Sequence, residues 1–161
     1  MARTKKTEES KIEEPKIAKK DCICAVGRRR EAVARVRIYS EKNSLLLNEM
    51  TLKKGDIIVN NLPIEKYFGG EVAKATYLEP LRITNTLNKF IVTIRILGGG
   101  KSGQLEAVVH GLSRALSELD RASFRPVLKK RGFLTRDSRT RERRKVGMGG
   151  KARRKRQSPK R

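Results

Sequence analysis

The stretch FIVTIRILGGGKSGQLEAVVHGLSRALSEL, residues 90–119, decides the fold. Its first eight residues are mostly apolar and β-branched, which predicts a strand. Three glycines then make a tight turn, and Ser102 is expected to cap the helix that follows. Apolar residues of this helix recur at the spacing of one face, and polar residues fall on the other side. The apolar face holds Leu105, Val108, Val109, Leu112, Leu116 and Leu119, and the polar side holds Glu106, His110, Ser113, Arg114 and Ser117.

A strand, a turn with Gly-Lys-Ser and a helix are also the layout of a nucleotide phosphate loop. That motif needs a glycine five positions before Gly100, where this chain has Arg95 inside the strand. No apolar strand ends in an Asp that could hold Mg²⁺. We therefore predict no catalytic residue, cofactor or metal, and keep a nucleotide-binding enzyme that uses residues 98–102 as the alternative. The free amides of such a turn, including that of Lys101, still suit a phosphate of an RNA backbone.

The net charge indicates the class of partner. The 161 residues carry a formal charge of +23, and the sequence pI is about 10.8. A compact chain with this charge repels itself unless a polyanion neutralises it, and nucleic acid is such a polyanion. No apolar run is long enough to span a bilayer, so no membrane partner is expected. Residues 131–161 hold fourteen Lys and Arg against two acidic residues.

Three regions differ in composition. Residues 1–20 have no apolar core and read as a disordered, charged arm. Residues 21–132 show strand patterns with the helices gathered late, and are predicted to form one globular α+β domain. Residues 133–161 hold few large apolar side chains and read as an extended basic tail. Within the domain we expect strands in 22–40, 43–50, 55–61 and 90–97, a helical turn in 62–68, a helix over 69–80 ended by Pro80, and a last helix over 121–132 ended by Gly132.

The segment after residue 31 alternates in the manner of a half-buried strand. Ala34, Val36 and Ile38 fall on its buried face, and Arg35, Arg37 and Tyr39 fall on its charged face.

Two cysteines stand two residues apart on the first predicted strand. Their side chains therefore point to one face and should be neighbours. A metal site would need further ligands, and His110 is the only histidine. We interpret Cys22 and Cys24 as small buried apolar side chains of a protein in a reducing cytoplasm.

The segment GGGKSGQLEAVVHGLSRAL resembles the family of the small-subunit ribosomal protein uS9. The blocks GRRREAVARVRIY, NNLPIEKYF, LTRDSRTRERRKVG and KARRKRQSPKR occur in the family's order, and the resemblance covers residues 25–161. It implies an α+β domain of the ribosomal protein S5 domain 2-like type, a twisted mixed sheet packed with helices, with an extended basic C-terminal tail. It also implies a structural constituent of the cytoplasmic ribosome, without enzymatic activity.

The same resemblance implies the partners. Members bind rRNA in the head of the small subunit, beside neighbouring ribosomal proteins, and their tail reaches towards P-site tRNA. The tRNA-binding residues would be Lys160 and Arg161. This chain departs from the family in two places: it is longer between Ser40 and Asn60, and Ser158-Pro159 stands where an aromatic residue and Ser are usual.

Basic residues are the candidates for rRNA contact. Aromatics make up only 4% of the chain, so RNA shape and phosphate placement are expected to be read instead of stacked bases. Counterion release would make such binding depend steeply on salt. A DNA compactor driven by the same charge and a solvated basic tail are the other interpretations. The predicted rRNA-binding residues are Arg28, Arg29, Arg30, Lys101, Arg136, Arg139, Arg143, Arg144, Lys145, Lys151, Arg153 and Arg154.

Overall fold

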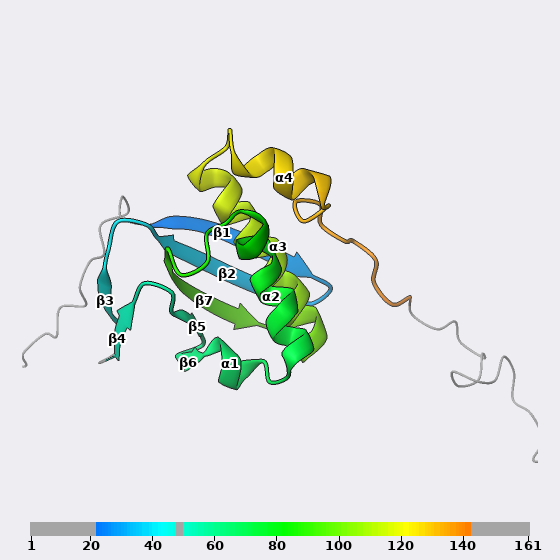
Figure 1. The fold of residues 1–161 in the computed structure, drawn as a ribbon. Coiled ribbons are helices and arrows are strands. Elements are labelled where there is room, and N and C mark those ends of the chain that lie inside the picture. The colour runs from blue at the N-terminus through cyan, green and yellow to red at the C-terminus, as the bar shows by residue number, and fades with distance from the viewer. Residues whose placement is uncertain (1–21, 48–49, 143–161) are drawn as a thin grey trace, which may run out of the picture.

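A mixed sheet with helices on one face forms the domain (Figure 1), which confirms the predicted α+β class. The structure is a computed structural model that describes residues 22–47 and 50–142. The sheet has five strands in the order β1-β2-β7-β5-β6, and β3 and β4 form a separate hairpin. The strands are β1 (Ile23–Arg29), β2 (Ala32–Tyr39), β3 (Ser44–Leu47), β4 (Met50–Lys53), β5 (Ile57–Val59), β6 (Leu62–Pro63) and β7 (Ile91–Leu97). The helices are α1 (Ile64–Tyr67), α2 (Glu71–Ile83), α3 (Lys101–Leu119) and α4 (Phe124–Lys130).

The sheet combines antiparallel and parallel pairs. β1 and β2 form a hairpin in which Arg29 stands opposite Ala32, and β2 pairs antiparallel with β7. β5 runs parallel to β7, and β6 turns back along β5. A parallel pair needs a crossover connection, and the segment with α1 and α2 provides it between β5 and β7.

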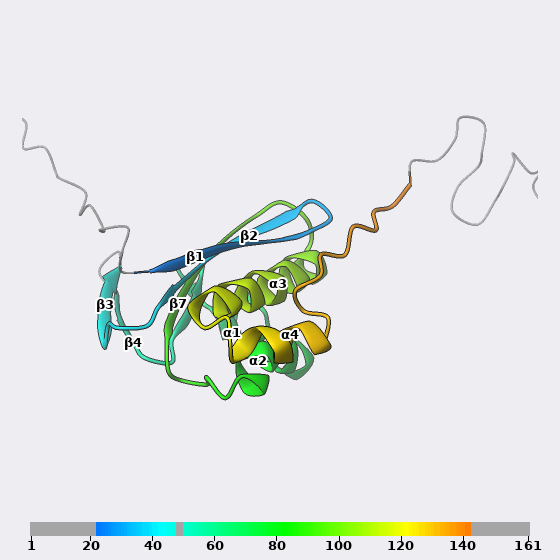
Figure 2. The ribbon, with the colours of Figure 1, turned by 90° about the horizontal axis from the view of Figure 1, so that it is seen from above.

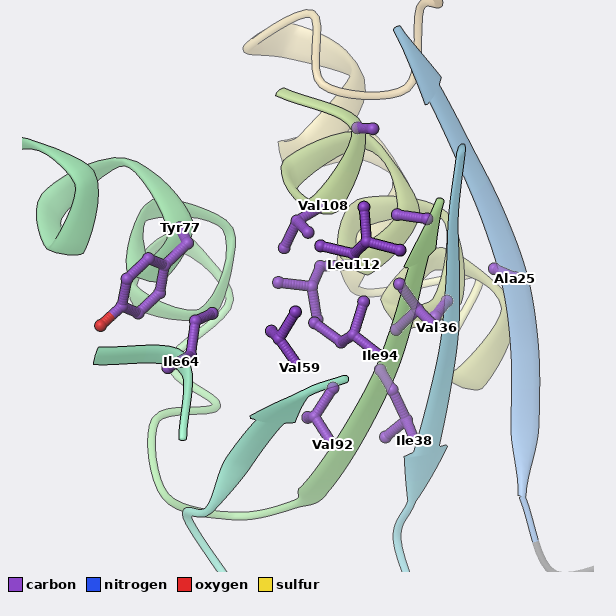
Figure 3. Packing of buried hydrophobic residues seen from close by; sticks show 14 of the residues in the cluster. Ala25, Val36, Ile38, Val59, Ile64, Tyr77, Val92, Ile94, Val108 and Leu112 are labelled. Carbon is purple, nitrogen blue, oxygen red and sulfur yellow. The ribbon is translucent and has the colours of Figure 1, made fainter. Parts of the chain in front are cut away.

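All four helices lie on one side of the sheet, with α3 next to β1 and β2 (Figure 2). The core fills the space between α3 and the sheet. Figure 3 shows Val108 and Leu112 of α3 pointing towards Val36 and Ile94 of the central strands. These side chains are almost fully buried, as the alternation of β2 and the apolar stripe of α3 predicted.

Two glycines bring α3 onto the backbone of β1. A Cβ at Gly27 would collide with the carbonyl oxygen of Ala107 and with the backbone of Gly111. A Cβ at Gly111 would stand 2.7 Å from a methyl group of Val36. The helix and the strand therefore touch backbone to backbone, which only glycine permits at these positions.

The hairpin β3–β4 covers one end of the opposite sheet face. Leu45 and Leu52 of the hairpin form a second apolar cluster with Tyr39, Ile58 and Ile91 of the sheet. Tyr39 was predicted on the charged face, and it lies on that face but is fully buried because the hairpin covers it. Its hydroxyl group has no hydrogen-bond partner among the described residues.

Two details of the helices differ from the prediction. Pro80 does not end α2, which continues to Ile83, because a proline removes a single helical hydrogen bond and Thr84 still donates to the Pro80 carbonyl. Gly100, not Ser102, occupies the N-cap position of α3, so Ser102 lies in the first turn. The predicted stop at Gly132 is confirmed, since its φ of +77° ends the last helix.

The polar side of α3 is also partly buried. Ser113 is fully buried, and Ser117 nearly so, on a helix that packs against α2 and α4 as well as against the sheet. The Ser113 hydroxyl donates to the Val109 carbonyl oxygen at 2.7 Å, which satisfies it within the helix. The prediction that the apolar residues of α3 face the core is confirmed, and the prediction that Ser113 and Ser117 lie on an exposed polar side is wrong.

The predicted burial of the cysteines is also wrong. Their Sγ atoms lie 3.6 Å apart, so the two are neighbours as expected. Cys24 is exposed, however, and Cys22 is half-buried. Cys24 stands on the outer face of β1, an edge strand that the helices cover on the other face only.

Candidate nucleic-acid interface

Strand alternation separates the three consecutive arginines. Arg28 and Arg30 are exposed, whereas Arg29 turns towards α3 and is 7% exposed. Arg30 occupies the β1–β2 turn in the left-handed region, with φ of +50°. The three guanidinium groups therefore do not form a single surface cluster, and only Arg28 and Arg30 face solvent.

The Arg29 side chain binds other groups of the protein. Its guanidinium lies 2.5 Å from a carboxylate oxygen of Glu106 on α3 and 3.1 Å from one of Asp137. It also donates to the backbone carbonyl of Arg139 at 2.7 Å. Residues 133–142, here called the tail root, are thus attached to β1 and α3. The role of Arg29 as a direct rRNA ligand stays a prediction.

Further contacts order the tail root. Phe133 and Leu134 pack against the main core. The Asp137 carboxylate accepts hydrogen bonds from the side chain and the backbone N–H of Arg139, and these bonds hold its pKa well below the ordinary value of a carboxyl group. Arg136 and Arg139 are exposed at this place.

His110 lies half-buried where α3, β1 and the tail root meet. Its Nδ1 accepts a hydrogen bond from the backbone N–H of Arg28 at 3.3 Å. Burial is the main cause that lowers its pKa, and the positive charges of Arg114 and Arg136 lower it further. The imidazole is consequently held in its neutral form as a structural contact.

The glycine turn serves packing in the structure. Gly98 and Gly99 have φ of +71° and +65°, and a Cβ on them would meet the carbonyl oxygen of Glu31 and the backbone of Ala32. The turn therefore lies directly against the β1–β2 turn. The Gln104 amide donates to the carbonyl oxygen of Gly98 at 3.0 Å, which closes the turn onto α3.

Lys101 is held at the start of α3. Its ammonium nitrogen lies 3.5 Å from the ring centroid of Tyr67 and donates to the Tyr67 carbonyl oxygen at 3.2 Å. The Tyr67 hydroxyl donates to the Gln104 side chain at 3.0 Å, so the ring is fixed in turn. Lys101 is exposed and keeps two of its three donors for a ligand.

The remaining predicted site residues lie outside the described residues. They are Arg143, Arg144, Lys145, Lys151, Arg153 and Arg154 for rRNA, and Lys160 and Arg161 for tRNA.

A basic hollow between α3 and α4 is lined by arginines that were not predicted as site residues. Arg114, Arg121 and Arg125 line a hollow of about 430 Å³ between α3, α4 and Leu134. Arg114 also donates to the carbonyl oxygen of Val26 at 2.5 Å. Arg114 belongs to α3, Arg121 precedes α4 and Arg125 belongs to α4, so the packing of α4 on α3 brings the three arginines together.

Within residues 22–47 and 50–142, no group of three or more His, Cys, Asp or Glu side chains could hold a metal ion. In the same ranges no helix combines the length and the apolar character that a membrane crossing requires.

Residues 27–161 match the family described as Ribosomal protein S9/S16. The chain belongs to the ribosomal protein S9 family. Relatives that bear the name small ribosomal subunit protein uS9 are among the matching proteins. The one from Anaeromyxobacter sp. (strain K) is 45% identical over 125 residues, 78% of this chain and 86% of the relative. The one from Maridesulfovibrio salexigens is 44% identical over 131 residues, 81% of this chain and 91% of the relative.

The S9 family consists of structural proteins of the small ribosomal subunit. The resemblance drawn from residues 25–161 is therefore confirmed, and so are the predictions of a ribosomal protein in translation and of a protein that is not an enzyme. The glycine turn that resembles a phosphate loop is accordingly explained by its packing against the β1–β2 turn.

Proposed function

We propose that this S9 family protein binds small-subunit rRNA through one end of its domain and through its tail. The observation that carries the proposal is the meeting of three segments at that end. Gly98 and Gly99 touch the β1–β2 turn, and Arg29 ties the tail root to the same place. Figure 2 shows the β1–β2 turn, the start of α3 and the orange tail root together at this end of the domain.

Five exposed cations surround this end: Arg28, Arg30, Lys101, Arg136 and Arg139. Arg presents a planar fork for two phosphate oxygens, and Lys presents a point charge. Glu106 and Asp137 pair with Arg29 and Arg139, and Glu31 of the β1–β2 turn is an exposed carboxylate, so Arg28, Arg30, Lys101 and Arg136 outnumber the unpaired acid at this end. The surface is therefore left with an excess of positive charge suited to RNA phosphates.

The tail extends this interface. The tail root, up to residue 142, runs away from the domain on this side (Figure 1). We propose that residues 143–156 track rRNA phosphates in the subunit head beside other ribosomal proteins. We further propose that Lys160 and Arg161 contact P-site tRNA, which rests on the family resemblance.

The finer fold type and the domain boundaries belong to the same proposal. We infer a ribosomal protein S5 domain 2-like fold, supported by a mixed sheet with helices on one face and a crossover between parallel strands. We also infer an arm of residues 1–20, a domain of 21–132 and a tail of 133–161. The first residues of that tail, Phe133 and Leu134, pack onto the domain and anchor it.

Sedimentation of a cell lysate tests the rRNA part. The protein should travel with small subunits and be released at high salt, because counterion release drives binding. A competition between duplex DNA and small-subunit rRNA at physiological salt separates this function from DNA compaction. Equal affinity for both polymers, or sedimentation apart from subunits, would remove the rRNA proposal.

Deletion of Lys160 and Arg161 tests the tRNA part. Subunits that carry the shortened chain should assemble normally and hold P-site tRNA more weakly. Unchanged tRNA retention would remove this part and leave the rRNA part standing.

A further inference from the structure

The sheet face opposite the helices carries a second basic surface, on the part that the β3–β4 hairpin leaves uncovered. On this face, away from the helices, β2 presents Arg35 and Arg37, and β7 presents Thr93 and Arg95. All three arginines are exposed. The sequence identified two of them only as the charged side of a strand, and the family resemblance assigned none of them a ligand.

The strand register places like charges side by side. Arg35 pairs with Arg95 across β2 and β7, and Arg37 pairs with Thr93. Directly opposite residues have Cβ atoms about 5 Å apart, and like charges there destabilise a sheet. β1, β2, β5 and β7 contain no Asp or Glu. Within the described residues no ion pair joins a carboxylate to these guanidinium groups.

The three arginines line a hollow of about 610 Å³, here called the arginine hollow. Leu47 of the β3–β4 hairpin and Asn60 beyond β5 also line it. Asn60 is held firmly: its amide nitrogen donates to the Ile96 carbonyl at 3.1 Å, and its amide oxygen accepts from the Ile96 N–H at 2.9 Å. The residue thereby continues the pairing of β7 after β5 ends, which keeps the hollow's wall in place without a ligand.

We propose that the arginine hollow binds the sugar–phosphate backbone of structured RNA, as a contact separate from the tail and the β1–β2 end. The inference rests on the proposed rRNA-binding function. A phosphate between Arg35 and Arg95 relieves the repulsion that the register imposes and accepts bidentate hydrogen bonds. No aromatic side chain lines the hollow, so it offers no platform for stacking bases and reads phosphate position alone.

Binding of the full-length chain to in vitro-transcribed small-subunit rRNA over a salt series tests the hollow. We expect R35Q/R95Q to reduce the slope of log K against log salt by about one, for the single phosphate bound between the two arginines. The matched control R82Q/K89Q removes two exposed charges near the end of α2 and before β7, outside the hollow, and should keep the wild-type slope. A wild-type slope in R35Q/R95Q would overturn the proposal.

A second pair of variants separates this inference from the proposed function. R28Q/R30Q alters the β1–β2 end and should weaken rRNA binding independently of the hollow. If the wild-type protein does not bind rRNA, the proposed function fails. If R28Q/R30Q loses affinity and R35Q/R95Q does not, only the hollow fails.

The partner class is tested in assembled small subunits. Leu97, which lines the hollow and is 57% exposed, is replaced by a photo-crosslinking amino acid. We expect crosslinks to rRNA. Crosslinks to a neighbouring protein alone would make the hollow a protein contact and overturn the assignment to RNA.

Discussion

The guanidinium of Arg29 and the carboxylate of Asp137 lie 3.1 Å apart, although they come from the first strand and from the segment after the last helix. Glu106 of α3 contacts the same guanidinium at 2.5 Å. The Arg29 side chain is 8% exposed, so water screens these contacts only weakly on that side. One inward-facing arginine thus joins β1 and α3 to residues 137–139 of the tail root, beside the packing of Phe133 and Leu134 on the core.

Removal of the Asp137 carboxylate should loosen the tail root. In D137A the Arg139 N–H loses its acceptor, which is 2.9 Å away, and Arg29 loses one ion pair. We expect faster amide hydrogen exchange over residues 135–142 at neutral pH. E142A removes an exposed acid of the same segment and should exchange as the wild type does.

The same carboxylate predicts a pH dependence. Hydrogen bonds from Arg139 lower the pKa of Asp137, so its contribution is present above the ordinary carboxyl range and is lost as pH falls below it. Exchange over residues 135–142, after correction for intrinsic rates, should therefore rise only well below about pH 4. A rise between pH 7 and 5 that D137A abolishes would contradict the assignment.

Much of the fold was predictable because its signals are local. The β-branched run of β7 and the apolar stripe of α3 lie within one continuous stretch, and the structure places them at Ile91–Leu97 and Lys101–Leu119. Arg29 is the opposite case. Three consecutive arginines indicate one exposed cluster, whereas strand alternation turns the middle one inward to partners on α3 and in the tail root. Those partners are distant in sequence, so no local pattern points to them.

The arginine hollow could not be predicted from the sequence for a similar reason. The alternation of β2 predicts Arg35 and Arg37 on one face, but the register with β7 brings Arg95 opposite Arg35. Whether a residue on this face is buried also depends on which other elements pack over it. Tyr39 shares the face of Arg35 yet is buried, because the β3–β4 hairpin covers that end only.

A methyl group at Gly27 should destabilise the domain strongly. The added Cβ would collide with backbone atoms of Ala107 and Gly111, which cannot move without displacing α3 from the sheet. Overpacking commonly costs about 1–3 kcal/mol and more where backbone must shift, so we expect G27A to lose about 3 kcal/mol or more. Denaturant unfolding measures the loss. G100A is the control, because no atom lies within 4 Å of its Cβ, and it should change stability by less than about 1 kcal/mol.

Replacement of Tyr39 by Phe should stabilise the domain. The Tyr39 hydroxyl is buried without a partner among the described residues, and an unsatisfied buried polar group costs about 1–3 kcal/mol. We expect Y39F to raise the free energy of unfolding by about 1 kcal/mol. Y67F should act in the opposite direction, because the Tyr67 hydroxyl bonds to Gln104 at 3.0 Å. A loss of stability in Y39F would mean that its hydroxyl has a partner.

His110 should make the domain less stable in mild acid. Burial, with Arg114 and Arg136 nearby, lowers its pKa in the folded state, so the unfolded chain takes up the proton more readily. The stability due to neutral His110 is therefore complete above the ordinary pKa of about 6.5 and is lost as pH falls through the lower folded value. The wild-type free energy of unfolding should decrease from pH 7.5 to pH 5.5.

The variant H110Q isolates this effect, because His110 is the only histidine of the chain. A glutamine oxygen can still accept from the Arg28 N–H but does not titrate, so the decrease between pH 7.5 and 5.5 should be smaller in H110Q. Urea unfolding at both pH values gives the comparison. Equal decreases in the two proteins would show that His110 is protonated as easily in the folded chain as in the unfolded one. The contact between His110 and the Arg28 backbone would then not depend on the neutral ring.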